Sequence, residues 1–178
     1  MNKTFTKEFI RANLDCYNKQ SKAFLPLANE RLESLSDPVT LKDIFESNIR
    51  IEDKFWWLMV HTDITVPELQ SIAKDIAEVA VRIYKAETGS DLLGSYWQGA
   101  KNGVNTEDQV KAMIKEGNDP ISRSGNATKS VARSIAAQFT PGHKRPLAIK
   151  ASQRLVFAGL HNEIYTGWIN ELLLSYGI

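Results

Sequence analysis

The sequence has little cysteine and no long apolar run, and each absence excludes a class of protein. Its single cysteine, Cys16, excludes an internal disulfide framework among the 178 residues and favours a reducing, cytoplasmic setting. No stretch approaches the ~18 consecutive apolar residues of a membrane-spanning helix. Residues 1–15 are charged throughout and contain no apolar core of a secretory signal. The sequence therefore predicts a cytoplasmic globular protein with no membrane partner.

Motifs for metal binding and nucleophilic catalysis are also missing. The three histidines, His61, His143 and His161, are far apart and form no HxxxH or HExxH pattern, so we predict no metal site and no cofactor. The chain has no GxSxG elbow, and Cys16 has no neighbouring histidine to activate its thiol. We therefore expect a binding protein rather than an enzyme.

Residues 122–130 match a phosphate-binding P-loop only in their last two positions. The pattern GxxxxGK[ST] requires glycine at two positions that this chain fills with arginine and threonine, and no hydrophobic strand precedes it. A loop rich in serine, glycine and asparagine that opens into a helix still presents backbone N–H groups to an anion. Two interpretations stay open: an anion beside Arg123 and Lys129, or capping of the helix by Ser124 or Asn126.

Acidic residues are absent from the 43 residues between Pro120 and Asn162, and this absence is the strongest signal in the composition. The segment carries seven basic side chains, whereas residues 1–119 carry 15 basic and 19 acidic ones and residues 163–178 add two acidic ones. A chain with a net charge of +1 is thus divided into an acidic body and a basic segment, which is typical of proteins with an anionic partner. The alternative is that the basic side chains only compensate the acidic helices beside them.

The basic segment supplies the candidate partner-binding or anion-binding residues. Lys129 and Arg133 are four residues apart and share one face of a helix. Residues 143–145 are expected in a loop with Pro141 and Gly142 that folds back beside them. The segment carries too few aromatic residues for a nucleic-acid stacking platform, so a nucleic-acid partner is not expected. The candidate set is Arg123, Lys129, Arg133, His143, Lys144, Arg145, Lys150 and Arg154.

Apolar residues recur at helical spacing almost throughout, which predicts an all-α fold. The clearest helix starts at Thr65, where Thr65 and Glu68 form a capping box, and it stops at Gly89. Its apolar stripe predicts that Ile76, Ala80 and Ile83 are buried. The expected helices cover residues 6–14, 17–35, 40–45, 51–61, 65–88, 90–100, 106–114 (with a second capping box at Thr106), 126–139 and 147–176, the last bent or divided at Gly159.

No segment shows sustained strand alternation, and no linker rich in glycine, serine or proline divides the chain. We therefore predict a single-domain, all-α bundle of about seven to nine helices over residues 1–178. It combines the acidic helical body 1–119, the basic helical segment 120–162 and a C-terminal helix up to residue 178. The adjacent residues Trp56 and Trp57 cannot both face the core, so one of them is available to a second interface.

Several short motifs follow one another along the chain: FIRANLDCY at residues 9–17, LKDIFES at 41–47, WWL at 56–58 and WINELL at 168–173, with a proline-led helix between the last two. Their order resembles an immunity-protein family that occurs beside bacterial polymorphic toxins and among phage proteins. The resemblance implies an all-α, non-enzymatic protein that neutralises an effector by binding it.

These observations together predict a cytoplasmic binding protein that inhibits an effector, a toxin or a defence protein, by direct protein–protein contact. The alternative is that it sequesters a phosphate-bearing nucleotide signal in a basic pocket between helices. The two hypotheses differ in where the basic charge converges. A convex basic surface favours a protein partner, whereas an enclosed pocket with two or more arginines and an aromatic wall favours a nucleotide.

Overall fold

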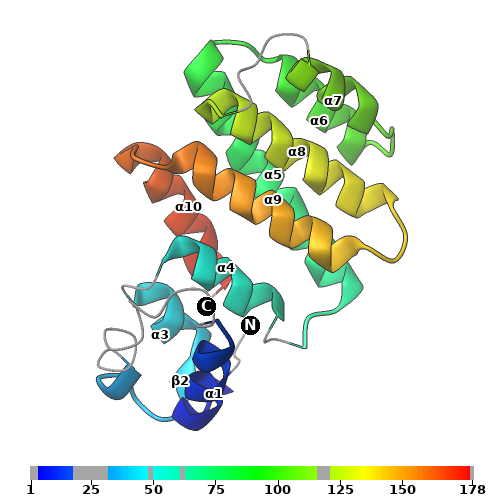
Figure 1. Cartoon of the computed structure of the whole chain (residues 1–178). Coiled ribbons are helices and arrows are strands. Elements are labelled where there is room, and N and C mark those ends of the chain that lie inside the picture. Colours follow the sequence, from blue (N-terminus) through cyan, green and yellow to red (C-terminus); the bar gives the residue numbers. More distant parts are fainter. Residues whose placement is uncertain (1–3, 18–31, 48–49, 61–62, 116–120, 177–178) are drawn as a thin grey trace.

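The computed structural model describes residues 4–17, 32–47, 50–60, 63–115 and 121–176 (Figure 1). This part of the chain confirms the predicted all-α fold, with nine helices and one short pair of strands. The helix predicted over residues 17–35 lies mostly outside the described residues. The elements are β1 (Thr4–Phe5), α1 (Lys7–Tyr17), β2 (Val39–Thr40), α3 (Leu41–Glu46), α4 (Ile51–Val60), α5 (Val66–Thr88), α6 (Leu92–Lys101), α7 (Glu107–Lys115), α8 (Arg123–Phe139), α9 (Lys144–Gly159) and α10 (Glu163–Tyr176).

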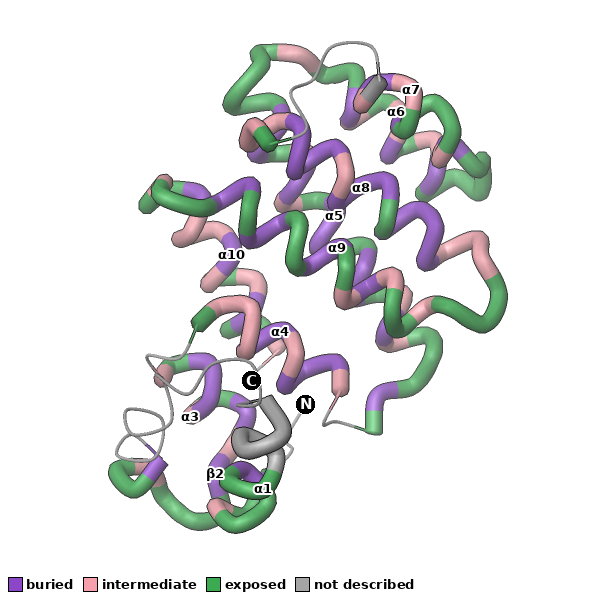
Figure 2. Tube along the Cα trace, in the orientation of Figure 1, coloured by how far each residue is buried: buried purple, intermediate pink, exposed green. Residues whose placement is uncertain are grey.

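Helices α5, α8 and α9 lie side by side at the centre of the molecule (Figure 1). Helices α6 and α7 lie at one end of this layer, and α4 and α10 cover it toward the other end, where α1, α3 and the strands are found. Buried residues are concentrated where the three central helices contact one another (Figure 2). The basic helices α8 and α9 therefore lie in the middle of the bundle.

Helix α5 begins and ends where the sequence predicts. The Thr65 N–H donates to Glu68 Oε2 at 2.7 Å, and the Glu68 N–H donates back to Thr65 Oγ1 at 3.4 Å. Gly89 closes the helix in the left-handed conformation, with φ of 71°, which glycine adopts without strain. The predicted burial of the stripe is confirmed, because Ile76, Ala80 and Ile83 have no exposed surface.

Helix α8 starts earlier than the prediction of residue 126. Its N-cap is Ser122, whose hydroxyl accepts the Gly125 N–H at 3.0 Å, and Ser124 and Asn126 lie inside the first turns. The expectation that one of those two residues caps the helix is therefore wrong. Small side chains on the buried faces bring α8 close to α9, so that the Ser130 hydroxyl donates to the Ala151 carbonyl at 2.8 Å.

Helix α9 also starts earlier, at Lys144 instead of Leu147. His143 occupies the N-cap position, so Lys144 and Arg145 belong to the first turn of a helix and the expectation of a loop there is wrong. Of the two alternatives at Gly159, the chain takes division into two helices. A Cβ atom at Gly159 would stand 2.6 Å from Ile169 Cδ1, so glycine lets α10 pack directly on the end of α9.

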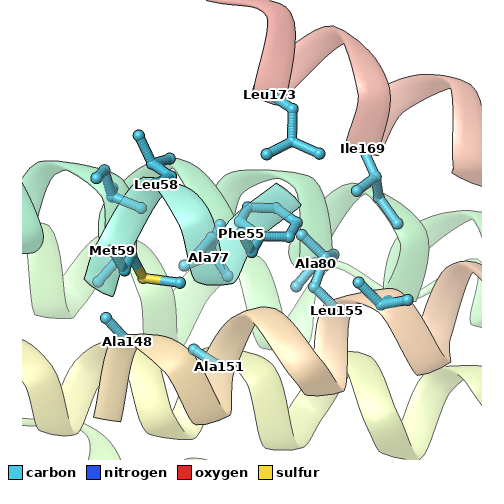
Figure 3. Packing of buried hydrophobic residues seen from close by; sticks show 14 of the residues in the cluster. Phe55, Leu58, Met59, Ala77, Ala80, Ala148, Ala151, Leu155, Ile169 and Leu173 are labelled. Carbon is cyan, nitrogen blue, oxygen red and sulfur yellow. The ribbon is translucent and has the colours of Figure 1, made fainter. Parts of the chain in front are cut away.

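Helix α4 adds large side chains to the core. Phe55 and Met59 project from α4 onto small residues of α5 and α9 (Figure 3). Trp57 is buried on another side of α4, with its ring centroid 5.4 Å from that of Phe5 in β1. Trp56 is half-buried and packs against the same core, with its ring centroid 6.0 Å from that of Trp57, so its part in a second interface stays a prediction.

The sequence analysis did not predict strands β1 and β2. They pair antiparallel with Thr4 opposite Thr40 and Phe5 opposite Val39. Two residues are too few to produce a recognisable alternation of apolar and polar positions. Thr40 caps α3 through a capping box with Asp43, at the start of the helix predicted over residues 40–45.

Candidate functional site

A cleft with a volume of about 200 Å³ opens among helices α7, α8 and α9. Four of its side chains are cationic, one is a carboxylate and two are apolar. The lining residues are Glu107, Lys111, Ile114, Lys129, Ala132, Arg133 and Arg154. Three of the eight predicted site residues therefore lie around one concave surface, although about 20 residues separate Arg133 from Arg154 along the chain.

Helical spacing explains how α8 contributes to the cleft. Lys129, Ala132 and Arg133 follow the i, i+3, i+4 pattern and share one face of the helix. The small residues on the other faces of α8 are buried against its neighbours. Packing α8 against α5 and α9 therefore leaves the face with Lys129 and Arg133 toward the cleft.

Helix α7 forms the opposite wall, and the sequence analysis missed this contribution. Glu107, Lys111 and Ile114 follow an i, i+4, i+7 pattern, which marks one helix face but does not say what that face contacts. The capping box predicted at Thr106 is not formed. The Thr106 hydroxyl donates to the Tyr96 carbonyl at 2.8 Å, which ties the start of α7 to α6.

The cations that line the cleft differ in their contacts within the chain. Lys111 Nζ forms an ion pair with Glu107 Oε1 at 2.6 Å, so one cation is compensated within α7. An Arg154 Nη atom donates to the neutral Asn126 Oδ1 at 3.3 Å. Within the described residues, no carboxylate pairs with Arg133 or Arg154. The side chains that line the cleft are therefore suited to an anionic group supplied by another molecule.

Arg123 lies outside the cleft and has a carboxylate partner. Its Nη1 is 4.0 Å from Glu87 Oε1 at the end of α5. Burial, reinforced by a hydrogen bond to the same Glu87, raises the pKa of Tyr165 at the start of α10. Arg123 thus fits the interpretation that the basic residues are counter-charges for the acidic body. Arg133 and Arg154 fit it less well, because no carboxylate of the described residues pairs with them.

The remaining predicted residues cluster at the start of α9, away from the cleft lining. Lys144 donates to the carbonyl oxygens of Ala137 and Gln138, at 3.3 and 3.2 Å, and so caps the end of α8. His143, Arg145 and Lys150 are exposed. Of the whole predicted set, the structure brings together Lys129, Arg133 and Arg154 and leaves the others elsewhere.

The described residues contain neither a cluster of metal ligands nor a helix suited to a membrane. No group of three or more histidine, cysteine, aspartate or glutamate side chains gathers there as ligands for a metal ion. None of the helices found in the described ranges combines the length and the apolar character needed to cross a bilayer. The side chain of Cys16 lies outside the described part.

Comparison with known protein families, curated proteins and solved structures finds no match to this chain. The resemblance to an immunity-protein family therefore stays a prediction, and the functional argument depends on the cleft.

Proposed function

We propose that this chain is a non-enzymatic cytoplasmic protein that inhibits an effector, a toxin or a defence protein, by binding it. An acidic part of the effector docks at the cleft between α7, α8 and α9. The observation that carries the proposal is the surplus of cationic side chains there, four against one carboxylate among the described residues that line the cleft. Three of the four come from the segment between residues 120 and 162 that contains no acidic residue.

The size of the cleft supports a protein partner over a whole nucleotide. Small-molecule sites commonly occupy about 300–1,000 Å³, whereas this cleft has about 200 Å³. It has the two arginines expected of a nucleotide pocket, Arg133 and Arg154, but no aromatic residue among the described residues that line it. A space of this kind fits one anchoring group, such as a carboxylate side chain at the edge of a larger interface.

Charge reversal in the cleft tests the proposal. Truncating one partner of a buried, hydrogen-bonded charge pair costs about 2–5 kcal/mol, whereas changing a rim charge mainly alters the association rate. We expect Lys129→Glu combined with Arg133→Glu to weaken effector binding at least about tenfold, or about 1.4 kcal/mol. Binding by the wild-type protein should also weaken as salt is raised.

The chain offers a matched control for this experiment. Arg145→Glu combined with Lys150→Glu makes the same change in net charge at exposed positions outside the cleft lining. Proteins captured by the tagged wild type are compared with those captured by each double variant. The captured effector is then purified, and its activity and its affinity for each variant are measured. Equal affinity for both variants, or an effector that stays fully active when bound, would contradict the proposal.

The second candidate function, sequestration of a phosphate-bearing nucleotide, is favoured by the pair of guanidinium groups in the cleft. Arg133 and Arg154 present planar donors that match phosphate oxygens. Calorimetric titration with nucleoside mono- and diphosphates, cyclic dinucleotides and inorganic phosphate separates the two functions. Micromolar or tighter binding of a nucleotide, lost in the Lys129→Glu, Arg133→Glu variant, would favour this second function.

A further inference from the structure

Three large apolar side chains are exposed where α9 ends and α10 begins. Phe157, Leu160 and Ile164 are 48%, 45% and 64% exposed, and we call them the apolar ridge. Phe157 and Leu160 are three residues apart. The Thr166 hydroxyl donates to the Gly159 carbonyl at 3.1 Å, which ties the first turns of α10 to the end of α9.

The ridge is not needed to complete the core of the described residues. The other faces of α9 already pack inward, with Leu155, Val156 and Ala158 buried. Clusters of exposed apolar side chains on a folded protein commonly mark a surface that another molecule covers. The position of the ridge on the outside of α9 therefore indicates an interface.

Arg154 connects the ridge to the cleft. Its guanidinium carbon lies 5.9 Å from the centre of the Phe157 ring, within the range of a cation–π contact. Arg154 also lines the cleft together with Lys129 and Arg133. Ridge and cleft are therefore two parts of one continuous surface, with an arginine at their junction.

We infer that this continuous surface binds an acidic, amphipathic segment of a partner protein. The inference rests on the proposed function and names the chemistry of the partner. Carboxylates of the segment occupy the cleft beside Arg133 and Arg154, and its apolar side chains cover Phe157, Leu160 and Ile164. Charge complementarity selects this occupant, because Lys129, Arg133, Arg154, Phe157 and Leu160 belong to the stretch 120–162 without acidic residues, and no carboxylate of the described residues pairs with Arg133 or Arg154. Arginine is among the residues most enriched at the positions that dominate binding energy in interfaces.

Synthetic peptides test the inference without knowledge of the natural partner. The probe is a helix-forming peptide of ~15 residues with leucine on one face and glutamate elsewhere. One control peptide has lysine in place of glutamate, and another has alanine in place of leucine. We expect fluorescence anisotropy to show binding of the acidic amphipathic peptide to the full chain and at least about tenfold weaker binding of both controls.

Two surface variants locate the peptide. Leu160→Ser removes an apolar side chain of the ridge, and Leu92→Ser removes one of matching exposure, 46%, on α6. We expect Leu160→Ser to weaken peptide binding about tenfold and Leu92→Ser to leave it unchanged. Circular dichroism establishes that both variants are folded, as expected for substitutions at exposed positions.

The outcomes separate this inference from the proposed function. Suppose that the Lys129→Glu, Arg133→Glu variant loses the captured effector while Leu160→Ser retains both effector and peptide. The role of the ridge in binding is then overturned, and the role of the cleft is supported. Binding of the lysine peptide as tightly as the glutamate peptide, or no binding of either, overturns the inference. A wild-type dimer in sedimentation that Leu160→Ser converts to a monomer also overturns it, because the occupant is then a second copy of this chain.

Discussion

Lys54 is a buried cation on α4 with an unusual environment. Its side chain is only 7% exposed, and Nζ donates to the Phe45 carbonyl at the end of α3 at 2.5 Å. Burial disfavours the charged ammonium and lowers the pKa of Lys54 below its ordinary value of 10.5. The residue therefore joins α3 to α4 while the charge that it carries is unfavourable for the folded state.

This lowered pKa predicts how stability changes with pH. Between the folded-state pKa and 10.5, the unfolded chain binds more protons at Lys54 than the folded chain does. The contribution of Lys54 to the free energy of unfolding therefore rises as the pH rises toward 10.5. We expect wild type to gain stability relative to Lys54→Met over this interval, measured by urea denaturation at several pH values.

Lys42 on α3 provides the control for Lys54, because its side chain is 60% exposed. Lys42→Met removes one lysine without removing a buried charge. The stability difference between wild type and Lys54→Met should change with pH, and the difference between wild type and Lys42→Met should not. If neither difference changes with pH, or both change equally, burial does not lower the pKa of Lys54.

At the scale of elements, the end of α8 is held by contacts from two other helices. Gln138 Nε2 donates to the Gln70 carbonyl on α5 at 3.0 Å, and Gln70 Nε2 donates to the Gln138 carbonyl at 3.3 Å. Lys144, in the first turn of α9, adds its two hydrogen bonds to the carbonyls of Ala137 and Gln138. A positive charge at this position also suits the negative end of the α8 dipole.

These contacts predict that Lys144 is a structural residue, although it belongs to the basic segment. We expect Lys144→Ala to lower the free energy of unfolding by about 1–2 kcal/mol, because two carbonyls lose a charged donor. The exposed neighbour Arg145 serves as the control, and Arg145→Ala should change stability by less than about 0.5 kcal/mol. Equal stability of both variants, with effector binding lost only in Lys144→Ala, would instead assign Lys144 to the interface.

At the scale of the whole molecule, the buried apolar residues form one cluster from Phe5 in β1 to Leu173 in α10. Helix α4 links the part of this cluster around β1 to the central helices. Phe55 packs on the central helices, and Trp57 packs on Phe5. Trp97, at the opposite end, is buried on α6 and donates to Glu78 on α5 at 2.8 Å. A shared core of this kind favours unfolding of the whole chain in one step.

We therefore expect a single cooperative transition in urea, as a single domain requires. Far-UV circular dichroism should give the same midpoint as tryptophan fluorescence, both in the double variant Trp56→Phe, Trp57→Phe and in Trp97→Phe, because each variant removes the tryptophans at one end. A circular dichroism curve with two steps, or fluorescence midpoints that disagree with it within one variant, would divide the chain into separate units.

The site illustrates which parts of a binding surface a sequence can predict. Lys129 and Arg133 were paired correctly, because helical spacing alone places residues four apart on one face. Glu107, Lys111 and Ile114 were missed, because their meeting with α8 depends on how α7 packs and not on any neighbouring residue. Lys144 was grouped with the binding residues because charge in a sequence does not show whether a carbonyl or a partner receives it.

The same distinction between local and long-range contacts applies to the helices. Helix α5 follows from the sequence, since Thr65, Glu68 and Gly89 act on atoms within a few residues of themselves. The all-α class follows too, because apolar spacing repeats over most of the chain. The start of α8 at Ser122, the joining of α7, α8 and α9 around a cleft, and the exposure of Phe157 beside Arg154 required the tertiary structure. These features arise from contacts between segments far apart in the chain, and such contacts leave no periodic trace in the order of residues.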